Sequence, residues 1–188
     1  MTLKITGGKD RGRTVPSPKG NLARPTAAKI RQALFNILGA RVKGSSFLDL
    51  FAGSGIMGME ALSRGAESLI AIEADRKLSL ALKENYDHLG YESRVRVMND
   101  DVRAAAGRLP AKNFDIIFAD PPYKSPLGQA CIHLVDNKRL LKKGGLFILE
   151  HLHSFNPDFE STGLVSTDQR KYGQTVITFI QKREDQDV

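Results

Sequence analysis

Several residue types and patterns are scarce in this chain of 188 residues, and each absence narrows what the protein can be. A single cysteine, Cys131, excludes an internal disulfide framework and a cysteine-based zinc cluster, and its apolar neighbours predict an ordinary core position. The four histidines have no spacing typical of metal ligands, so we expect no metal. No apolar run is as long as a membrane span, and the amino terminus has no signal-peptide pattern. We therefore expect a cytoplasmic protein without a membrane partner.

Acidic residues are almost missing from the first quarter of the chain. Residues 1–45 contain ten lysines and arginines but only one acid, Asp10, which gives this segment a formal charge of +9. The remaining residues contain 18 basic and 20 acidic side chains, for a charge of −2. A cationic segment beside a nearly neutral body is typical of a protein that binds a polyanion. A basic face that only confers solubility is the alternative.

A glycine-rich turn follows the first strongly apolar strand pattern. Residues 47–55 read Phe-Leu-Asp-Leu-Phe-Ala-Gly-Ser-Gly, and residues 56–62 then read as a helix. Gly53 and Gly55 would let the backbone approach a ligand and would expose N–H groups at the helix start. Together with Gly58 they also match the Gly-x-Gly-x-x-Gly spacing, so this motif alone does not exclude a dinucleotide.

Acidic residues stand at the ends of successive apolar segments. Asp49 precedes the glycine turn, where its carboxylate could face the cationic amino-acid part of S-adenosylmethionine. Glu73 ends the next strand pattern twenty positions after Gly53, an offset that suits a carboxylate accepting ribose hydroxyls. A third strand pattern ends in Asp100 and Asp101, either of which could accept from an adenine amino group. Ligands bind at the carboxyl ends of strands in open α/β sheets, so these acids predict a cofactor at that edge.

The most informative motif is Asp120-Pro121-Pro122-Tyr123, directly after the apolar run 114–119. Because proline lacks a backbone donor and has a fixed φ, the carbonyls around Asp120 and Pro121 point in set directions. The Asp120 carboxylate and these carbonyls can accept hydrogen bonds from a planar NH2 group, while Tyr123 offers a ring for stacking. A flipped nucleobase with an exocyclic amine fits this arrangement. A turn that merely ends a strand is the alternative.

Together these motifs resemble the class I S-adenosylmethionine-dependent methyltransferases with an amine acceptor. Four flanking stretches narrow the resemblance: Ile5-Thr-Gly-Gly-Lys-Asp-Arg-Gly-Arg13, Arg24-Pro-Thr26, Ala33-Leu-Phe-Asn-Ile-Leu38 and Lys171-Tyr-Gly-Gln-Thr175. With them the chain is similar, over roughly residues 3 to 182, to the RsmD family of bacterial 16S rRNA guanine-N2 methyltransferases.

The resemblance implies S-adenosylmethionine as cofactor and 16S rRNA as partner, within an assembled or assembling small ribosomal subunit. It implies catalytic roles for Asp120, Pro121 and Tyr123. The expected cofactor-binding residues are Asp49, Phe51, Gly53, Ser54, Gly55, Glu73, Asp100 and Asp101. The expected contacts to substrate RNA are Lys9, Arg11, Arg13, Arg24, Thr26, Arg170 and Lys171, although Arg24 could instead lock its own loop.

The fold class that we expect is α/β, with a Rossmann-like class I methyltransferase sheet that is mostly parallel with a reversed edge strand. We expect a basic extension over residues 1–45 packed on a core over 46–182, with a frayed tail over 183–188, in a single structural domain. In the extension, the patterns of residues 3–6 and 11–15 predict a small hairpin. Thr26 is expected to cap a helix over residues 27–38, with Ile30, Leu34, Ile37 and Leu38 toward the core.

The carboxyl-terminal part should contain one more helix and three strands. The pattern predicts a helix over residues 126–141 that stops at Lys142-Lys-Gly-Gly145, and then a strand over 146–150. Residues 163–167 and 175–181 alternate like an edge hairpin, and the polar residues between them are expected to form a loop. On that loop Arg170 and Lys171 could reach RNA or form a plain surface turn.

Three other functions share parts of this pattern. A DNA or RNA adenine-N6 methyltransferase uses the same pocket chemistry, but 188 residues leave little room for a sizeable DNA target-recognition domain. A nicotinamide-dependent oxidoreductase would explain the glycine turn and Glu73, but not Asp-Pro-Pro-Tyr or the terminal hairpin. A non-catalytic RNA-binding assembly factor would need only the basic segment.

Overall fold

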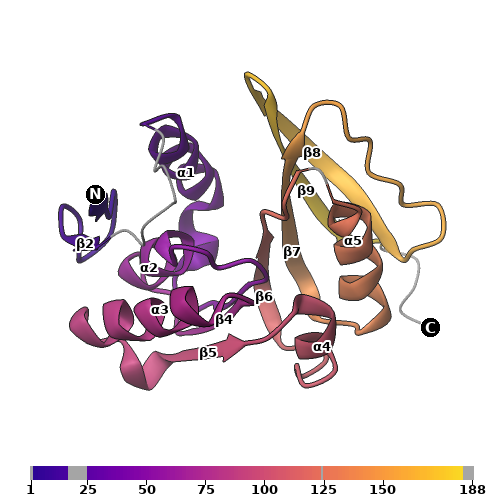
Figure 1. Ribbon diagram of the computed structural model, residues 1–188. Coiled ribbons are helices and arrows are strands. Elements are labelled where there is room, and N and C mark those ends of the chain that lie inside the picture. The colour runs from indigo at the N-terminus through magenta and orange to yellow at the C-terminus, as the bar shows by residue number, and fades with distance from the viewer. Residues whose placement is uncertain (1, 17–24, 124, 184–188) are drawn as a thin grey trace. The chain divides into compact units, whose positions relative to one another are not determined.

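The computed structural model describes residues 2–16, 25–123 and 125–183, and the chain divides into two compact units, residues 1–102 and 103–188. Figure 1 shows the elements coloured along the chain. Arg24, predicted to contact RNA, lies outside the described residues, as do residues 184–188 of the expected tail. Among the helices that are described, none has the length and apolar character needed to cross a membrane.

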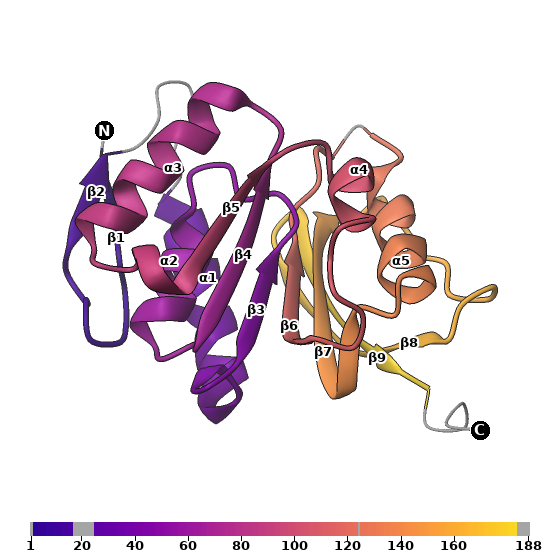
Figure 2. The same ribbon diagram turned by 90° about the horizontal axis from the view of Figure 1, so that it is seen from below.

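Parallel strands and crossover helices form the body of the first unit. Its strands run in the order β5-β4-β3, and each neighbouring pair is parallel. They are β3 (Ser46–Asp49), β4 (Ser68–Glu73) and β5 (Val95–Asn99), joined by helices α2 (Ile56–Ser63) and α3 (Arg76–His88). Both helices lie on the same face of these strands (Figure 2). The predicted alternation of strand and helix is confirmed here, because each apolar strand run is followed by a helix that packs back on it.

The amino-terminal segment of this unit forms the predicted hairpin and helix. Strands β1 (Thr2–Lys4) and β2 (Thr14–Pro16) pair antiparallel and are shorter than predicted. Helix α1 (Pro25–Leu38) leads into a 3-10 turn, η1 (Gly39–Val42), and a second such turn, η2 (Glu92–Arg94), precedes β5. Helix α1 begins at Pro25, two residues before the predicted start, and the side chain of Thr26, the predicted cap and RNA contact, lies outside the described part of the chain.

Helix α1 buries a slightly different stripe from the one predicted. Ile30, Leu34 and Leu38 are buried as expected, but Ile37 is 44% exposed. Phe35 takes its place in the core and stacks on Phe47 of β3, with ring centroids 6.4 Å apart. The buried stripe is therefore centred further round the helix than the sequence pattern indicated, and Ile37 lies beyond its edge.

The second unit carries the reversed strand. After the short helix α4 (Val102–Ala106), its strands lie in the order β6-β7-β9-β8. They are β6 (Phe114–Ala119), β7 (Leu141–Leu152), β8 (Leu164–Tyr172) and β9 (Thr175–Lys182), and helix α5 (Leu127–Asn137) packs against β7. Strands β6 and β7 are parallel, whereas β9 runs antiparallel to both β7 and β8. The expected fold class, α/β with mostly parallel strands and a reversed strand toward one edge, is confirmed.

Two expectations for this unit are wrong. Helix α5 ends at Asn137, and the Lys-Lys-Gly-Gly stretch read as a helix stop lies within β7, where the pairing with β6 shifts register. A Cβ on Gly145 would lie only 2.9 Å from the Phe114 carbonyl oxygen, so this glycine permits close approach of two strands. Strand β8 extends to Tyr172, so Arg170 and Lys171 belong to a strand and not to a loop.

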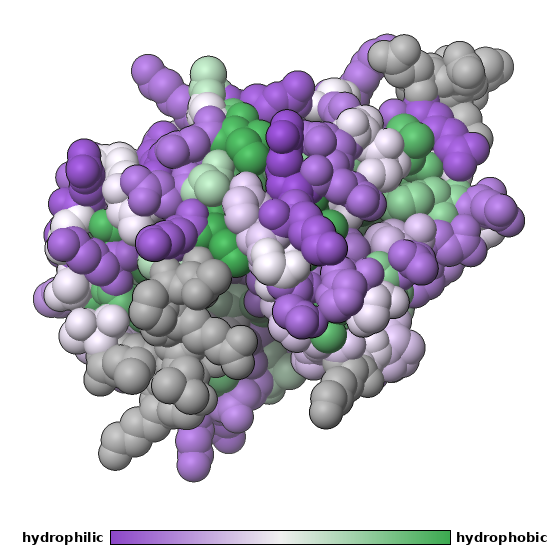
Figure 3. Space-filling view, turned by 90° about the horizontal axis from the view of Figure 1, so that it is seen from above, coloured by the Kyte–Doolittle hydropathy of each residue, from purple (hydrophilic) through white to green (hydrophobic). Residues whose placement is uncertain are grey.

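Each of the two units contains fully buried apolar side chains. Leu48 and Leu82 in the first unit and Ile117 and Ile148 in the second are fully buried, and Cys131 is buried as predicted. On the face shown in Figure 3 most of the visible surface is hydrophilic. The large hydrophobic side chains that remain exposed in the described part are Ile37, Leu80, Tyr123 and Val165. An exposed aromatic within a sequence motif, as at Tyr123, is typical of a binding position.

Candidate active site

The glycine turn connects β3 to α2 and is held by packing against α3. Gly53 and Gly55 both have positive φ, 50° and 78°, and Gly55 is the N-cap of α2. A Cβ on Gly55 would lie 2.2 Å from Cδ2 of Leu82, and the Gly55 carbonyl accepts a hydrogen bond of 3.2 Å from the Tyr86 hydroxyl. Gly55 is therefore required by conformation and by the close approach of α3. The turn brings backbone N–H groups to the carboxyl end of β3, where an anionic or polar ligand group can bind.

Glu73, at the end of β4, lies against this turn. One carboxylate oxygen of Glu73 accepts from the backbone N–H of Gly53 and the other from that of Asp75, each at 2.8 Å. These bonds fix the carboxylate at the sheet edge, while each oxygen keeps a second lone pair for a further donor. The side chain is half-buried. This geometry can accept a pair of vicinal hydroxyl groups, as predicted for a cofactor ribose.

Asp49 is the most unusual side chain of this edge. It is 1% exposed; its Oδ1 accepts from the Phe51 N–H at 3.3 Å, and its Oδ2 has no hydrogen-bond partner among the described residues. Burial, together with the charge of Glu73 and against the effect of the Phe51 hydrogen bond, raises the pKa of Asp49 to about 7. Buried acceptors are normally paired, so this orphaned oxygen indicates a place for a donor supplied by a ligand. A cationic amino group fits that requirement.

The acids after β5 complete the set of predicted cofactor-binding residues. The Asp100 N–H donates to the Glu73 carbonyl at 3.2 Å, and the Asp101 N–H donates to Asp100 Oδ1 at 2.9 Å. Asn99, which sequence reasoning missed, donates its amide to the carbonyls of Glu73 and Ala74 at 2.9 and 3.0 Å. The first unit therefore gathers at the carboxyl ends of its strands all the predicted cofactor residues: Asp49, Phe51, Gly53, Ser54, Gly55, Glu73, Asp100 and Asp101.

The Asp-Pro-Pro-Tyr motif follows β6 in the second unit. Asp120 is exposed, Pro121 is buried, and the Tyr123 side chain is partly exposed at the start of a turn. The Tyr123 hydroxyl donates to Oε1 of Glu150 at 3.0 Å. Partial burial and the negative charges of Asp120 and Glu150 raise the pKa of Tyr123 above its ordinary range, so the phenol stays protonated. An acid, a rigid proline pair and an accessible ring are thus present together within one unit.

Glu150 was not predicted as a site residue, although the sequence carried a signal for it. It ends the apolar run 146–149 as the other acids end theirs, and Ala119 of β6 pairs in register with Leu149 of β7. Asp120 and Glu150 therefore follow equivalent positions of neighbouring parallel strands. Among the described residues, no group of three or more histidine, cysteine or acidic side chains is arranged to hold a metal ion.

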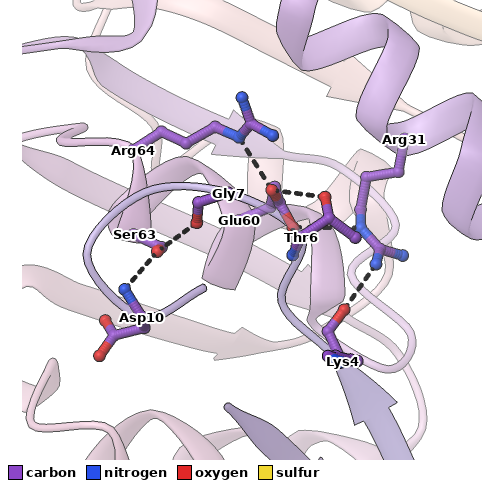
Figure 4. Close-up of polar contacts among 8 residues, drawn as sticks. All are labelled: Lys4, Thr6, Gly7, Asp10, Arg31, Glu60, Ser63 and Arg64. Atoms are coloured by element: carbon purple, nitrogen blue, oxygen red, sulfur yellow. Dashed lines mark hydrogen bonds and ion pairs between the residues drawn. The ribbon is translucent and has the colours of Figure 1, made fainter. Parts of the chain in front are cut away.

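The hairpin loop, residues 5–13, contains three of the predicted RNA contacts and is docked on the end of α2 (Figure 4). The Lys9 N–H donates to the Ser63 carbonyl at 2.8 Å, and the Ser63 hydroxyl bridges the loop by donating to the Gly7 carbonyl and accepting from the Asp10 N–H. A Cβ on Gly8 would lie 2.0 Å from the Ser63 carbonyl oxygen, so the contact is close along its length. The loop is therefore a rigid platform.

The three basic side chains of this loop differ in their surroundings. Lys9 places its Nζ 4.8 Å from the centre of the Tyr91 ring, which Arg94 also contacts at 5.5 Å. Arg13 forms a 2.9 Å ion pair with Asp10 while its side chain remains 43% exposed. Arg11 is exposed. All three cations can meet phosphate from this position, and Arg94 is a neighbouring cation that sequence reasoning did not single out.

Not all of the charge counted in residues 1–45 reaches the surface. Arg31 is 7% exposed and pairs with the buried Glu60 of α2 at 3.4 Å, and its guanidinium also donates to the Lys4 carbonyl at 2.8 Å. Glu60 pairs in addition with Arg64 at 2.8 Å. Arg31 therefore serves to attach the basic segment to α2. At the other end of the chain, Arg170 pairs with Asp168 at 2.8 Å on β8, and Lys171 is exposed on the same strand.

The strand topology, the glycine turn and the acids that end successive strands define the class I methyltransferase fold. A solved structure of a candidate methyltransferase of Escherichia coli, yhhF, matches with a TM-score of 0.85 and 31% sequence identity, over 97% of this chain and 98% of that one.

The family model described as conserved hypothetical protein 95 matches residues 3–181, and the chain belongs to this family. A candidate rRNA methyltransferase of Bacillus subtilis, YlbH, is 33% identical over 183 residues, which cover 96% of this chain and all of the relative. The ribosomal RNA small subunit methyltransferase D of Escherichia coli K12 is 35% identical over 148 residues, 79% of this chain and 74% of the relative. The resemblance to the RsmD family that the motifs indicated is confirmed.

Proposed function

We propose that this protein transfers a methyl group from S-adenosylmethionine to the exocyclic N2 of a specific guanine in 16S rRNA. The observation that carries the proposal is the Asp-Pro-Pro-Tyr motif at the end of β6, where an exposed carboxylate and an accessible aromatic ring lie on a rigid turn. Relatives named as rRNA methyltransferases support rRNA as the substrate class. S-adenosylmethionine is the cofactor of this class of enzyme, and the first unit supplies residues that fit it.

The residues of the first unit would hold the cofactor by its polar groups. Asp49 would accept from the amino group, which gives the orphaned Oδ2 its partner. Glu73 would accept from the ribose hydroxyls, and Asp100 or Asp101 from the adenine amine. When bound, S-adenosylmethionine supplies an electrophilic methyl group on its sulfonium.

The residues of the second unit would hold the acceptor base. Asp120 and the Pro121 carbonyl would accept the two N2 hydrogens of a flipped guanine that stacks on Tyr123. These contacts orient the nitrogen for in-line attack, in which an N–C bond forms while the C–S bond breaks. Alignment is the main catalytic effect, because sulfonium is already a good leaving group. The N2 proton leaves after transfer, and Asp120 can relay it to water.

The basic hairpin loop would hold the RNA by its phosphates. Lys9, Arg11 and Arg13 lie on a loop that is rigidly attached to α2, so they can fix the register of the RNA. Because the chain offers only a short basic segment, we propose that it recognises a preassembled surface of the small subunit. Methylation of protein-free 16S rRNA as fast as of assembled particles would overturn this part of the proposal.

Replacement of Asp120 separates the catalytic role from cofactor binding. The variant Asp120→Ala is expected to lower turnover by more than about tenfold while cofactor affinity, measured by calorimetry, stays at the wild-type value. The matched control is Asp115→Ala, which removes a carboxylate from the other end of the same strand, where Asp115 pairs with the half-exposed Lys142. A loss below about tenfold in Asp120→Ala would exclude the proposed role.

A further inference from the structure

Tyr123 is tied to the sheet by a residue outside the motif. Its hydroxyl donates to Oε1 of Glu150 at 3.0 Å, although its side chain is 44% exposed. Glu150 lies in β7 between Leu149 and His151, which are 0% and 4% exposed. One end of an accessible ring is thus bound to a carboxylate that is itself fixed by buried neighbours.

Glu150 and Tyr123 come from backbone segments that differ in rigidity. Glu150 pairs in register with Ile177 of β9, and the residue before it pairs with Ala119 of β6, so its strand has a neighbour on each side. Tyr123 lies beyond the end of β6, in a turn where the N–H and hydroxyl of Ser125 donate to the Pro122 carbonyl at 3.0 and 2.7 Å. The carboxylate therefore comes from the more rigid element, and the ring from the turn.

Such an anchor matters for a stacking platform. An exposed aromatic on a turn can occupy several rotamers, and fixing one of them when a base binds would cost conformational entropy. A ring that is already held avoids this cost, which raises affinity without adding any contact to the ligand. Burial raises the pKa of Glu150, partly against the effect of the Tyr123 hydrogen bond, so an acid is kept here at some energetic cost.

We propose that Glu150 is a positioning residue for the acceptor base, acting through Tyr123: it holds the ring in the orientation on which the base stacks. This inference rests on the proposed function for the identity of the base. It assigns no contact between Glu150 and the RNA, so the effect of removing Glu150 should be the effect of freeing the ring.

Four variants test this coupling: Glu150→Ala, Glu150→Gln, Tyr123→Phe and the double variant of Glu150→Ala with Tyr123→Phe. In methylation of unmodified small ribosomal subunits, Glu150→Ala should lower kcat/KM by about tenfold, mainly through KM, because it removes the bond that holds the ring. Tyr123→Phe should lower kcat/KM at least as much, because it removes this bond and also the side-chain hydrogen bond between Tyr123 and Thr175. The double variant should be no worse than Tyr123→Phe alone. Glu150→Gln keeps an acceptor oxygen and should stay within about threefold of wild type. Losses in kcat/KM that add in the double variant would overturn the proposal. So would a Tyr123→Phe protein with wild-type kcat/KM if Glu150→Ala is impaired.

A second readout needs no activity. With tyrosine labelled at the ring carbon that bears the hydroxyl, NMR compares the resonance of Tyr123 at neutral pH in wild type and in Glu150→Ala. Loss of the hydrogen bond to the carboxylate should shift this resonance, whereas an unchanged resonance would refute the contact in solution. A wild-type protein that forms no N2-methylguanosine yet shows the shift would refute the proposed function alone. An active wild type with no shift and an unimpaired Glu150→Ala would refute the positioning role alone.

Discussion

Replacement of Glu60 by alanine should destabilise the protein severely. Glu60 is completely buried in α2 and accepts hydrogen bonds from the Thr6 N–H and hydroxyl, each at 2.8 Å. It also pairs with Arg64 at 2.8 Å and with Arg31 at 3.4 Å (Figure 4). Glu60→Ala would remove the common partner of two guanidinium groups and of one backbone donor. The hairpin loop, α1 and α2 would lose their shared polar contact at once.

The size of the effect follows from which partners stay buried. Arg31 is 7% exposed, so it would be left as an uncompensated buried charge, and breaking such a pair costs about 3–5 kcal/mol. Arg64 is 18% exposed and can reorient toward water, so we add little for it. With a urea dependence of roughly 2 kcal/mol per molar, the unfolding midpoint should fall by on the order of 2 M.

Urea unfolding followed by circular dichroism measures this change. The matched control is Glu84→Ala, which removes an exposed glutamate from helix α3 and should alter the free energy of unfolding by less than about 0.5 kcal/mol. The variant Glu60→Gln keeps an acceptor for Thr6 but not the charge, and should lie between the two. A Glu60→Ala protein within about 1 kcal/mol of wild type would refute the view that Glu60 fastens the basic segment to the core.

Three further variants test other parts of the structure. The pKa of Asp49 is about 7 in the folded protein against an ordinary 3.8. Its ionisation therefore does not lower the free energy of unfolding at low pH, but lowers it increasingly as the pH rises from about 4 to 7. Asp49→Asn should therefore be as stable as wild type near pH 4 and more stable by up to roughly 4 kcal/mol above pH 7. It should also bind S-adenosylmethionine more weakly. Equal pH profiles of stability in the two proteins would contradict this reasoning. Gly8→Ala should lower the free energy of urea unfolding by about 2 kcal/mol or more, because the new Cβ would lie 2.0 Å from a carbonyl oxygen. Gly12→Ala, with open space around it, should lower it by about 1 kcal/mol. Equal losses would contradict the close docking of the hairpin loop on α2. Arg11→Ala should reduce the slope of log affinity for RNA against log salt by about 0.7–0.9, and the exposed Lys83→Ala should leave it unchanged; an unaltered slope in Arg11→Ala would remove that contact.

The sequence predicted the elements whose apolar runs are bounded by polar residues. Strand β6 has the bounds of the predicted run 114–119 and β4 ends at Glu73 as predicted, because a short buried run meets an acid at its end in β4 and directly after its end in β6. The predictions of secondary structure were wrong where contacts between distant parts of the chain determine the conformation. The glycines at 144 and 145 look like a helix stop, yet Gly145 is needed where β7 approaches β6 closely. The polar end of β8 looks like a loop because its strand is the outermost of its unit and much of it faces water.

The candidate site was predictable to the extent that each acid ends a strand. Asp49, Glu73 and Asp120 were found in this way, and Glu150 could have been found by the same rule. The sequence does not show which buried charges pair with one another. The buried pair of Glu60 with Arg31 joins residues 29 positions apart, so Arg31 was counted as surface charge although it is internal. The one indication in the sequence was the acid Glu60, which stands between Met59 and Ala61 in the apolar helix α2.

The most direct test of the central claim is a tritium-transfer assay. Purified protein and methyl-labelled S-adenosylmethionine are incubated with small ribosomal subunits that lack the modification, and the RNA is digested to nucleosides for chromatography. Asp120→Ala protein serves as the matched control. The account predicts label in N2-methylguanosine with the wild-type protein and almost none with the variant. Label in N6-methyladenosine, or no label although the cofactor binds, would contradict it.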